Sequence, residues 1–73
     1  MKYTVILEKG DKYGYVAKVP VLRGCVSQGR TKTEAVKNVK QAIEAYIEAL
    51  LEDGLPVPTE IGTDVVQLEV AAR

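Results

Sequence analysis

Nine apolar residues recur at spacings of three and four between positions 35 and 51, and this pattern constrains the fold more than any other feature. At about 100° per residue they cover half of a helix circumference, the width of a core-facing stripe. The segment Thr31-Lys32-Thr33-Glu34 in front of them matches a capping box, and Gly54 with Pro56 behind them ends a helix. The pattern predicts one helix over residues 32 to 53. Its apolar residues are Ala35, Val36, Val39, Ala42, Ile43, Tyr46, Ile47, Leu50 and Leu51.

Alternating apolar and polar residues before this helix predict a β-hairpin. Residues 2 to 8 and residues 13 to 19 both alternate with period two, and such alternation is typical of strands with one buried face. The polar segment between them contains Gly10, which can take a positive φ and so favours a turn. Pro20 lacks an N–H and ends the second strand.

Two further segments have the composition of strands. Residues 25 to 28 predict a short third strand, bracketed by Gly24 and Gly29, which we assign to turn geometry. Residues 65 to 70 alternate again and predict a fourth strand. The element order β-β-β-α-β predicts an α+β fold of two layers, with a mostly antiparallel sheet and one long helix on one face. The last strand is expected beside the first, in the order 3-2-1-4, or paired with a second chain.

The length of the chain predicts a single domain over residues 1 to 73 that associates with itself. A domain of 73 residues buries only about 60% of the surface that its unfolded chain exposes. One cysteine excludes an internal disulfide, and the absence of histidine excludes the usual zinc sites. We therefore expect a homodimer or homotetramer that buries one more face.

Charge is balanced overall but divided along the chain. Ten basic and ten acidic residues give a formal net charge of zero, which argues against bulk affinity for nucleic acids. Residues 1 to 30 hold six basic and two acidic residues, whereas residues 31 to 73 hold four basic and eight acidic ones. This division indicates either internal compensation on a small surface or a surface complementary to a charged partner.

The residues that usually carry catalysis are missing, so we predict a protein that is not an enzyme and holds neither cofactor nor metal. Without histidine, Cys25 has no imidazole to activate it, and it is expected to be a small buried residue. No glycine-rich phosphate loop is present. Glu8 and Glu69 on the strands could serve a minimal nuclease, but a solvated face explains them better.

Three glutamates form the candidate partner-binding residues. Glu44, Glu48 and Glu52 follow one another at four-residue spacing along one helix edge, where like charges repel and oppose the helix dipole. A solvated helix face, relieved by Lys40, is one interpretation. An acidic strip that docks a basic partner is the other.

The tyrosines support an alternative function. Tyr13 and Tyr15 in the predicted hairpin, together with the basic first half of the chain, could form a small RNA-binding sheet that stacks on bases. Their positions on the same faces as apolar strand residues favour packing in the core or an interface instead.

No part of the sequence suggests a membrane or export signal. Its apolar runs stay well below the ~18 residues that a membrane span needs, and its N-terminus lacks the apolar core of a signal peptide. We therefore expect a cytoplasmic protein without membrane contact.

Residues 13 to 35 resemble the signature of HicB-like antitoxins. The family pattern is a strand running into a proline, a Gly-Cys step, and a glycine followed by Thr and by Glu-Ala on the helix. The chain departs from it at Val21, Arg23 and Arg30, where the family commonly carries Asp, Pro and an acid. The matching residues are Gly14, Tyr15, Val19, Pro20, Gly24, Cys25, Ser27, Gly29, Thr31, Glu34 and Ala35.

This resemblance implies a fold like a truncated RNase H domain without its catalytic acids. It also implies a partner, a small mRNA-cleaving toxin of the HicA type, whose fold resembles a double-stranded RNA-binding domain. The antitoxin would neutralise the toxin by covering its active surface. Longer relatives append a DNA-binding module that has no counterpart in these residues, so we expect no direct DNA binding. Solitary relatives without an evident toxin also occur, so a solitary homologue is the other form of this hypothesis.

Overall fold

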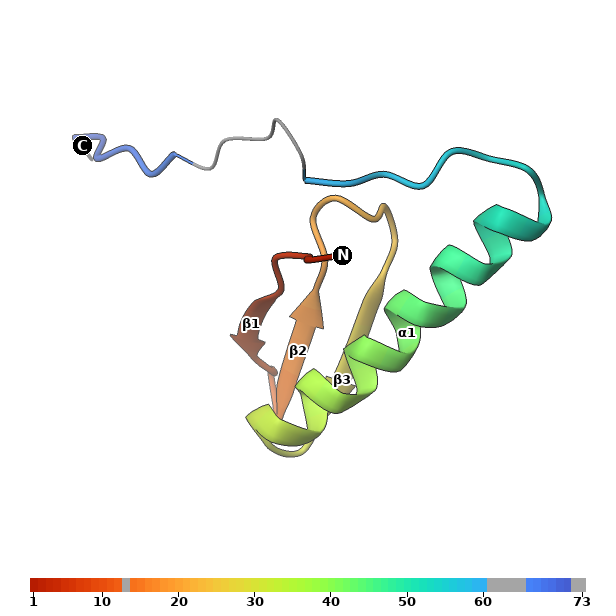
Figure 1. Cartoon of the computed structure of the whole chain (residues 1–73). Helices are drawn as coiled ribbons and strands as arrows, with labels where there is room; N and C mark the ends of the chain where they lie inside the picture. Colours follow the sequence, from red (N-terminus) through yellow and green to blue (C-terminus); the bar gives the residue numbers. More distant parts are fainter. Residues whose placement is uncertain (13, 61–65, 72–73) are drawn as a thin grey trace.

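The computed structural model describes residues 1–12, 14–60 and 66–71, in which a three-stranded sheet precedes one long helix (Figure 1). The elements are β1 (Ile6–Lys9), β2 (Tyr15–Lys18), β3 (Val26–Gly29) and α1 (Lys32–Glu52). The sheet is antiparallel in the order β1-β2-β3, and α1 crosses one of its faces. The predicted two-layer α+β class is confirmed, whereas the comparison with a truncated RNase H domain stays a prediction.

The pairing register separates a helix-facing row of side chains from an outer row. Leu7 lies opposite Ala17, which lies opposite Ser27 on β3. Ala17 is completely buried in the core, so this row faces α1. In the next row Ile6 lies opposite Lys18, and both side chains are exposed. The faces therefore agree with the alternation that predicted the hairpin.

The hairpin turn differs from the prediction in one detail. The Gly10 N–H donates to the Gly14 carbonyl oxygen at 2.9 Å, which closes the chain reversal between β1 and β2. The positive φ occurs at Gly14, at 77°, and not at Gly10. The left-handed residue is thus the one immediately before β2, where the chain must turn back into the sheet.

Between β2 and β3 the chain folds into a compact connection that supplies part of the core. The Val19 N–H donates to the Cys25 carbonyl oxygen at 3.1 Å, and the Cys25 N–H donates to the Leu22 carbonyl oxygen at 2.9 Å. Leu22 is completely buried, and Gly24 has a φ of 77°, which confirms its predicted turn geometry. Pro20, as predicted, follows the end of β2.

Six side chains form the buried core of the described residues, and α1 is longer than the sheet that it packs on. The helix has 21 residues, about 31 Å, while each strand has four residues, about 13 Å. The second half of α1 therefore extends beyond the sheet (Figure 1), and Leu51 is 64% exposed. The core residues are Ala17, Val19, Leu22, Cys25, Ala35 and Val39.

No helix in the described part of the chain combines the length and apolar character that crossing a membrane requires.

The predicted fourth strand is not part of this sheet. Val65 lies outside the described residues, and residues 66–70 form no strand in the structure. The predicted order 3-2-1-4 within one chain is therefore wrong for the described part of that segment. The physical reason is that residues 66–70 lie away from β1, with all their side chains exposed (Figure 1). The alternative of pairing with a second chain stays a prediction.

Candidate functional site

The start of α1 is fixed by the predicted capping box, with one shift in its hydrogen bonds. Thr31 is the N-cap, and its Oγ1 accepts from the Glu34 N–H at 3.1 Å. Glu34 Oε1 accepts from the Arg30 N–H at 2.9 Å, one residue before the N-cap whose N–H a regular capping box would satisfy. Both side chains therefore satisfy backbone donors at the helix start, which is a structural role.

Gly29 has a different role from the predicted one. It is the last residue of β3, and a Cβ placed on it would lie 2.5 Å from the Ala35 amide nitrogen and 2.8 Å from the Glu34 carbonyl carbon. Its φ is not positive, so turn geometry is not the reason for glycine here. A Cβ on Gly14 would collide with the Gly29 carbonyl oxygen. The glycines thus let β2, β3 and the first turn of α1 approach closely.

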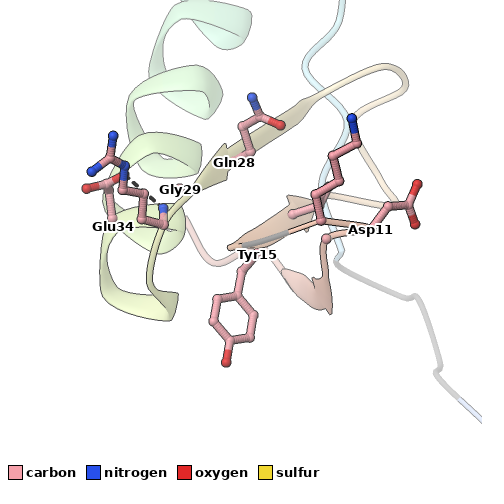
Figure 2. Close-up of a pocket in the computed structure, with 9 residues that line it drawn as sticks. Asp11, Tyr15, Gln28, Gly29 and Glu34 are labelled. Carbon is pink, nitrogen blue, oxygen red and sulfur yellow. Dashed lines mark hydrogen bonds between the residues drawn. The ribbon is translucent and has the colours of Figure 1, made fainter.

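Beside this contact lies a polar hollow of about 550 Å³ (Figure 2). Figure 2 shows Tyr15 and Gln28 pointing to opposite sides of the sheet, with Asp11 at one end of the hollow and Glu34 at the other. Its charges are mixed, and Glu34 Oε1 already accepts from the Arg30 backbone N–H. No group of three or more possible metal ligands occurs among the described residues. The lining residues are Gly10, Asp11, Lys12, Tyr15, Val16, Gln28, Gly29, Arg30 and Glu34.

Cys25 lies in the core and is 5% exposed. Burial raises the pKa of its thiol, because the thiolate loses its hydration there. A cysteine with little thiolate is a poor nucleophile. Its position is that of the small buried residue expected from the sequence.

The three candidate glutamates lie apart from this hollow. Glu44, Glu48 and Glu52 are all exposed on α1, with the last two on the half that extends beyond the sheet. One ion pair occurs within the described residues, from Lys18 Nζ to Glu8 Oε1 at 2.7 Å. The expected relief of Glu44 by Lys40 is therefore not seen as an ion pair. Glu34 and Glu52 are separated by 18 residues of helix, about 27 Å. The structure therefore does not bring the signature residues and the acidic strip together.

The described aromatic residues do not form a base-stacking surface. Tyr15 packs against the core on the helix side, and Lys32 Nζ lies 5.7 Å from its ring centroid. Tyr13 lies outside the described residues. The outer face of the three strands carries no aromatic side chain at its described positions, which are Ile6, Glu8, Val16, Lys18, Val26 and Gln28. The geometry thus disfavours the RNA-binding alternative.

A contact that no sequence pattern predicted holds the segment after α1 against the N-terminus. The Tyr3 hydroxyl donates to the Pro58 carbonyl oxygen at 2.6 Å. Glu60 accepts from the backbone N–H of Thr4 and, at 2.9 Å, from its hydroxyl. These bonds join residues more than 50 positions apart, and no local signal announces such a pairing.

An apolar groove of about 390 Å³ lies between the residues leading into β1 and the near side of α1. Val36 in this groove is 46% exposed, and Met1 is 82% exposed. The sequence predicted a broad core-facing stripe on the helix, but α1 contacts mainly β3 and β2 and leaves this side of the stripe open. The groove is lined by Met1, Tyr3, Val5, Val36, Val39, Lys40, Ile43, Glu44 and Ile47.

Fold and site together define a small two-layer α+β domain whose signature residues hold the helix on the sheet. The chain belongs to the HicB-like antitoxin family of bacterial toxin–antitoxin systems, because the sequence model of that family matches residues 3–71. An antitoxin family implies a toxin partner.

Similar proteins cover most of this chain. A UPF0150 protein of Thermoplasma acidophilum is 46% identical over 65 residues, which are 89% of this chain and 94% of that protein. A UPF0150 protein of Synechocystis is 53% identical over 58 residues, 80% and 73% of the two chains. Antitoxin HicB 1 of Photorhabdus laumondii is 32% identical across the whole of this chain, which spans half of that antitoxin.

Proposed function

We propose that the chain is a non-enzymatic antitoxin that binds a HicA-type mRNA-cleaving toxin and neutralises it by covering its RNA-binding surface. The observation that carries the choice of surface is the row of Glu44, Glu48 and Glu52, exposed along one edge of α1 and without ion pairs within the described residues. The family match over residues 3–71 supports the antitoxin role itself.

Charge explains why this row suits such a toxin. An enzyme that binds RNA presents basic side chains to the phosphates, and an acidic surface of matching shape can occupy the same place. The last turn of α1 contains no basic residue, so nothing within that turn neutralises Glu52. Because α1 extends beyond the sheet there, a partner can reach the row without displacing the core.

Neutralisation by covering requires no chemistry from the antitoxin. The raised pKa of the Cys25 thiol and the bond from Glu34 to the Arg30 backbone N–H give both side chains structural roles, in keeping with a protein that acts by binding. We further propose that the protein acts in the cytoplasm, where mRNA is the toxin's substrate, and that it works as a homodimer or homotetramer.

Co-expression with a HicA-type toxin tests the proposal. The toxin for this test is sought as a short basic protein encoded by a neighbouring reading frame, and growth after its induction is compared with and without the antitoxin. We expect growth to be restored and the two proteins to co-purify. Loss of both results would overturn the antitoxin role for this chain.

Titration calorimetry with a catalytically inactive form of the same toxin tests the surface. The double variant E48K/E52K should raise the dissociation constant about tenfold or more, because each substitution replaces an attraction by a repulsion. Asp11→Lys reverses one exposed acid outside α1 and is the control for each single reversal, E48K and E52K, measured beside the double variant. If growth is restored but the double variant binds as tightly as the control, the antitoxin role stands and the acidic row is excluded.

A further inference from the structure

The sheet leaves the edge of β1 without a partner within the described residues. β1 pairs with β2 on one side only, and α1 packs mainly over β3 and β2. No strand of the described residues pairs with the other side of Ile6–Lys9. An uncovered strand edge of this kind is a template for another strand.

The apolar groove described above lies on the helix side of the residues that lead into this edge. Val5 lines the groove from the residues that lead into β1, and Val36 and Ile43 line it from α1. Leu7, the next helix-facing residue of β1, is 36% exposed. A strand added to β1 would place every second side chain over this apolar surface, because successive side chains of a strand alternate between faces.

The chain contains a segment with the matching pattern. In Val66–Val70 the apolar residues alternate with Gln67 and Glu69, and the β-branched valines favour extended structure. Val66, Leu68 and Val70 are 72%, 81% and 83% exposed. Large apolar side chains gathered on one face of a segment form the kind of surface that an interface buries.

We propose that Val66–Val70 docks as a strand along β1 of a second copy of this chain, with Val66, Leu68 and Val70 filling that copy's apolar groove. Within its own chain, the preceding segment is tied at Glu60 to Thr4, and residues 66–71 lie away from their own sheet (Figure 1).

Each copy offers one groove and one strand, so a reciprocal exchange closes a two-fold dimer and leaves neither unused. The exchange also adds apolar burial to a domain whose own core is small. This inference does not depend on the identity of the toxin.

Light scattering coupled to size-exclusion chromatography tests the exchange on the full chain. We expect about twice the 8.0 kDa mass of one chain. Leu68→Asp should raise the dimer dissociation constant at least about 100-fold, because a buried leucine is lost from both strands. Gln67→Asp is the matched control, since Gln67 lies on the opposite face of the same strand, and it should remain dimeric. Circular dichroism confirms that each variant retains its helix.

Mixing two defective variants distinguishes exchange from docking within one chain. Val36→Asp damages the groove while Leu68→Asp damages the strand, so each variant alone has no intact contact. A pair containing one of each has one intact strand in one intact groove, and dimer should reappear on mixing. A monomeric wild-type chain, a dimer that survives Leu68→Asp, or a mixture that stays monomeric would each overturn the proposal.

Discussion

Gly29 and Ala35 approach so closely that a Cβ on Gly29 would lie 2.5 Å from the Ala35 amide nitrogen. Gly29 ends β3, and Ala35 is completely buried in the first turns of α1. The missing side chain therefore sets the distance between helix and sheet, and with it the packing of Ala35 and Val39 on Ala17. This contact explains why a glycine stands at the end of β3, two residues before the cap at Thr31.

Replacement of Gly29 by alanine should lower the free energy of unfolding by about 3 kcal/mol, because backbone atoms of α1 would have to move. Gly24→Ala is the comparison. Gly24 has a positive φ but no atom within 4 Å of its Cβ position. Its substitution should therefore lower the free energy of unfolding by only about 1 kcal/mol, the cost of the left-handed backbone. Urea denaturation measures both, and equal losses would contradict the close-approach explanation.

The capping box makes a smaller, separable contribution. Thr31→Ala removes the acceptor of the Glu34 N–H and should lower the free energy of unfolding by about 1 kcal/mol. Thr31→Ser keeps the hydroxyl and should change the free energy of unfolding by only about 0.3 kcal/mol. The measurement is urea denaturation followed by helix ellipticity. A serine variant as unstable as the alanine variant would assign the loss to the threonine methyl group instead.

Burial of Cys25 predicts a dependence of stability on pH above about pH 8.5. Because its pKa is raised in the folded state, the native thiol keeps its proton where the unfolded thiol has lost it. The unfolded state then binds fewer protons, so the free energy of unfolding falls as pH rises through this range and is unaffected below it. Cys25→Ala should remove this component of the alkaline decrease.

The same burial predicts slow chemical modification. In the folded chain the thiol should react with a chromogenic disulfide reagent much more slowly than in urea, since both access and thiolate are reduced. Equal rates in the two conditions would show that Cys25 is accessible in solution.

Glu60 should hold the segment after α1 without adding much to global stability. Glu60→Ala removes two bonds to Thr4, and each such exposed bond contributes about 0.5–1.5 kcal/mol at most. We expect faster proteolysis between residues 55 and 60, with a small change in the urea midpoint. Glu69→Ala, which removes an exposed acid elsewhere, is the control. Unchanged proteolysis would mean that Tyr3 and Pro58 suffice for the contact.

Local chemistry explains what could be predicted from the sequence. The helix bounds differ by one residue from the prediction because the cap at Thr31 and the stop at Gly54 act on their own neighbours. The hairpin faces agree because alternation within a strand decides which side is apolar. Turn geometry at Gly24 could be predicted because a positive φ is a property of the residue and its immediate neighbours.

Contacts between residues far apart in the sequence explain what could not be predicted from it. The sequence predicts a turn at Gly29 because nothing in its neighbourhood indicates that α1 returns to contact it. The bond between Thr4 and Glu60 joins exposed polar residues that follow no pattern. For residues 66–70 the alternation is evident, but alternation specifies a face and not a partner. The acidic row was found from its spacing, while its place on the overhanging half of α1 follows from strand lengths that only the structure gives.

Glu52 should oppose helix stability while it serves binding, and a single charge reversal separates the two effects. It lies at the carboxyl end of α1, where the last turn has no basic residue and the helix dipole favours positive charge. Glu52→Lys should therefore raise the free energy of unfolding by about 0.3–1 kcal/mol and, if the acidic row contacts the toxin, weaken toxin binding at the same time. Urea denaturation and calorimetry on one preparation measure both, with Asp11→Lys as the control that changes charge equally outside the helix. A variant that loses both stability and affinity would show that the acid is needed for folding, whereas gained stability with reduced affinity is the signature of a residue retained for its partner.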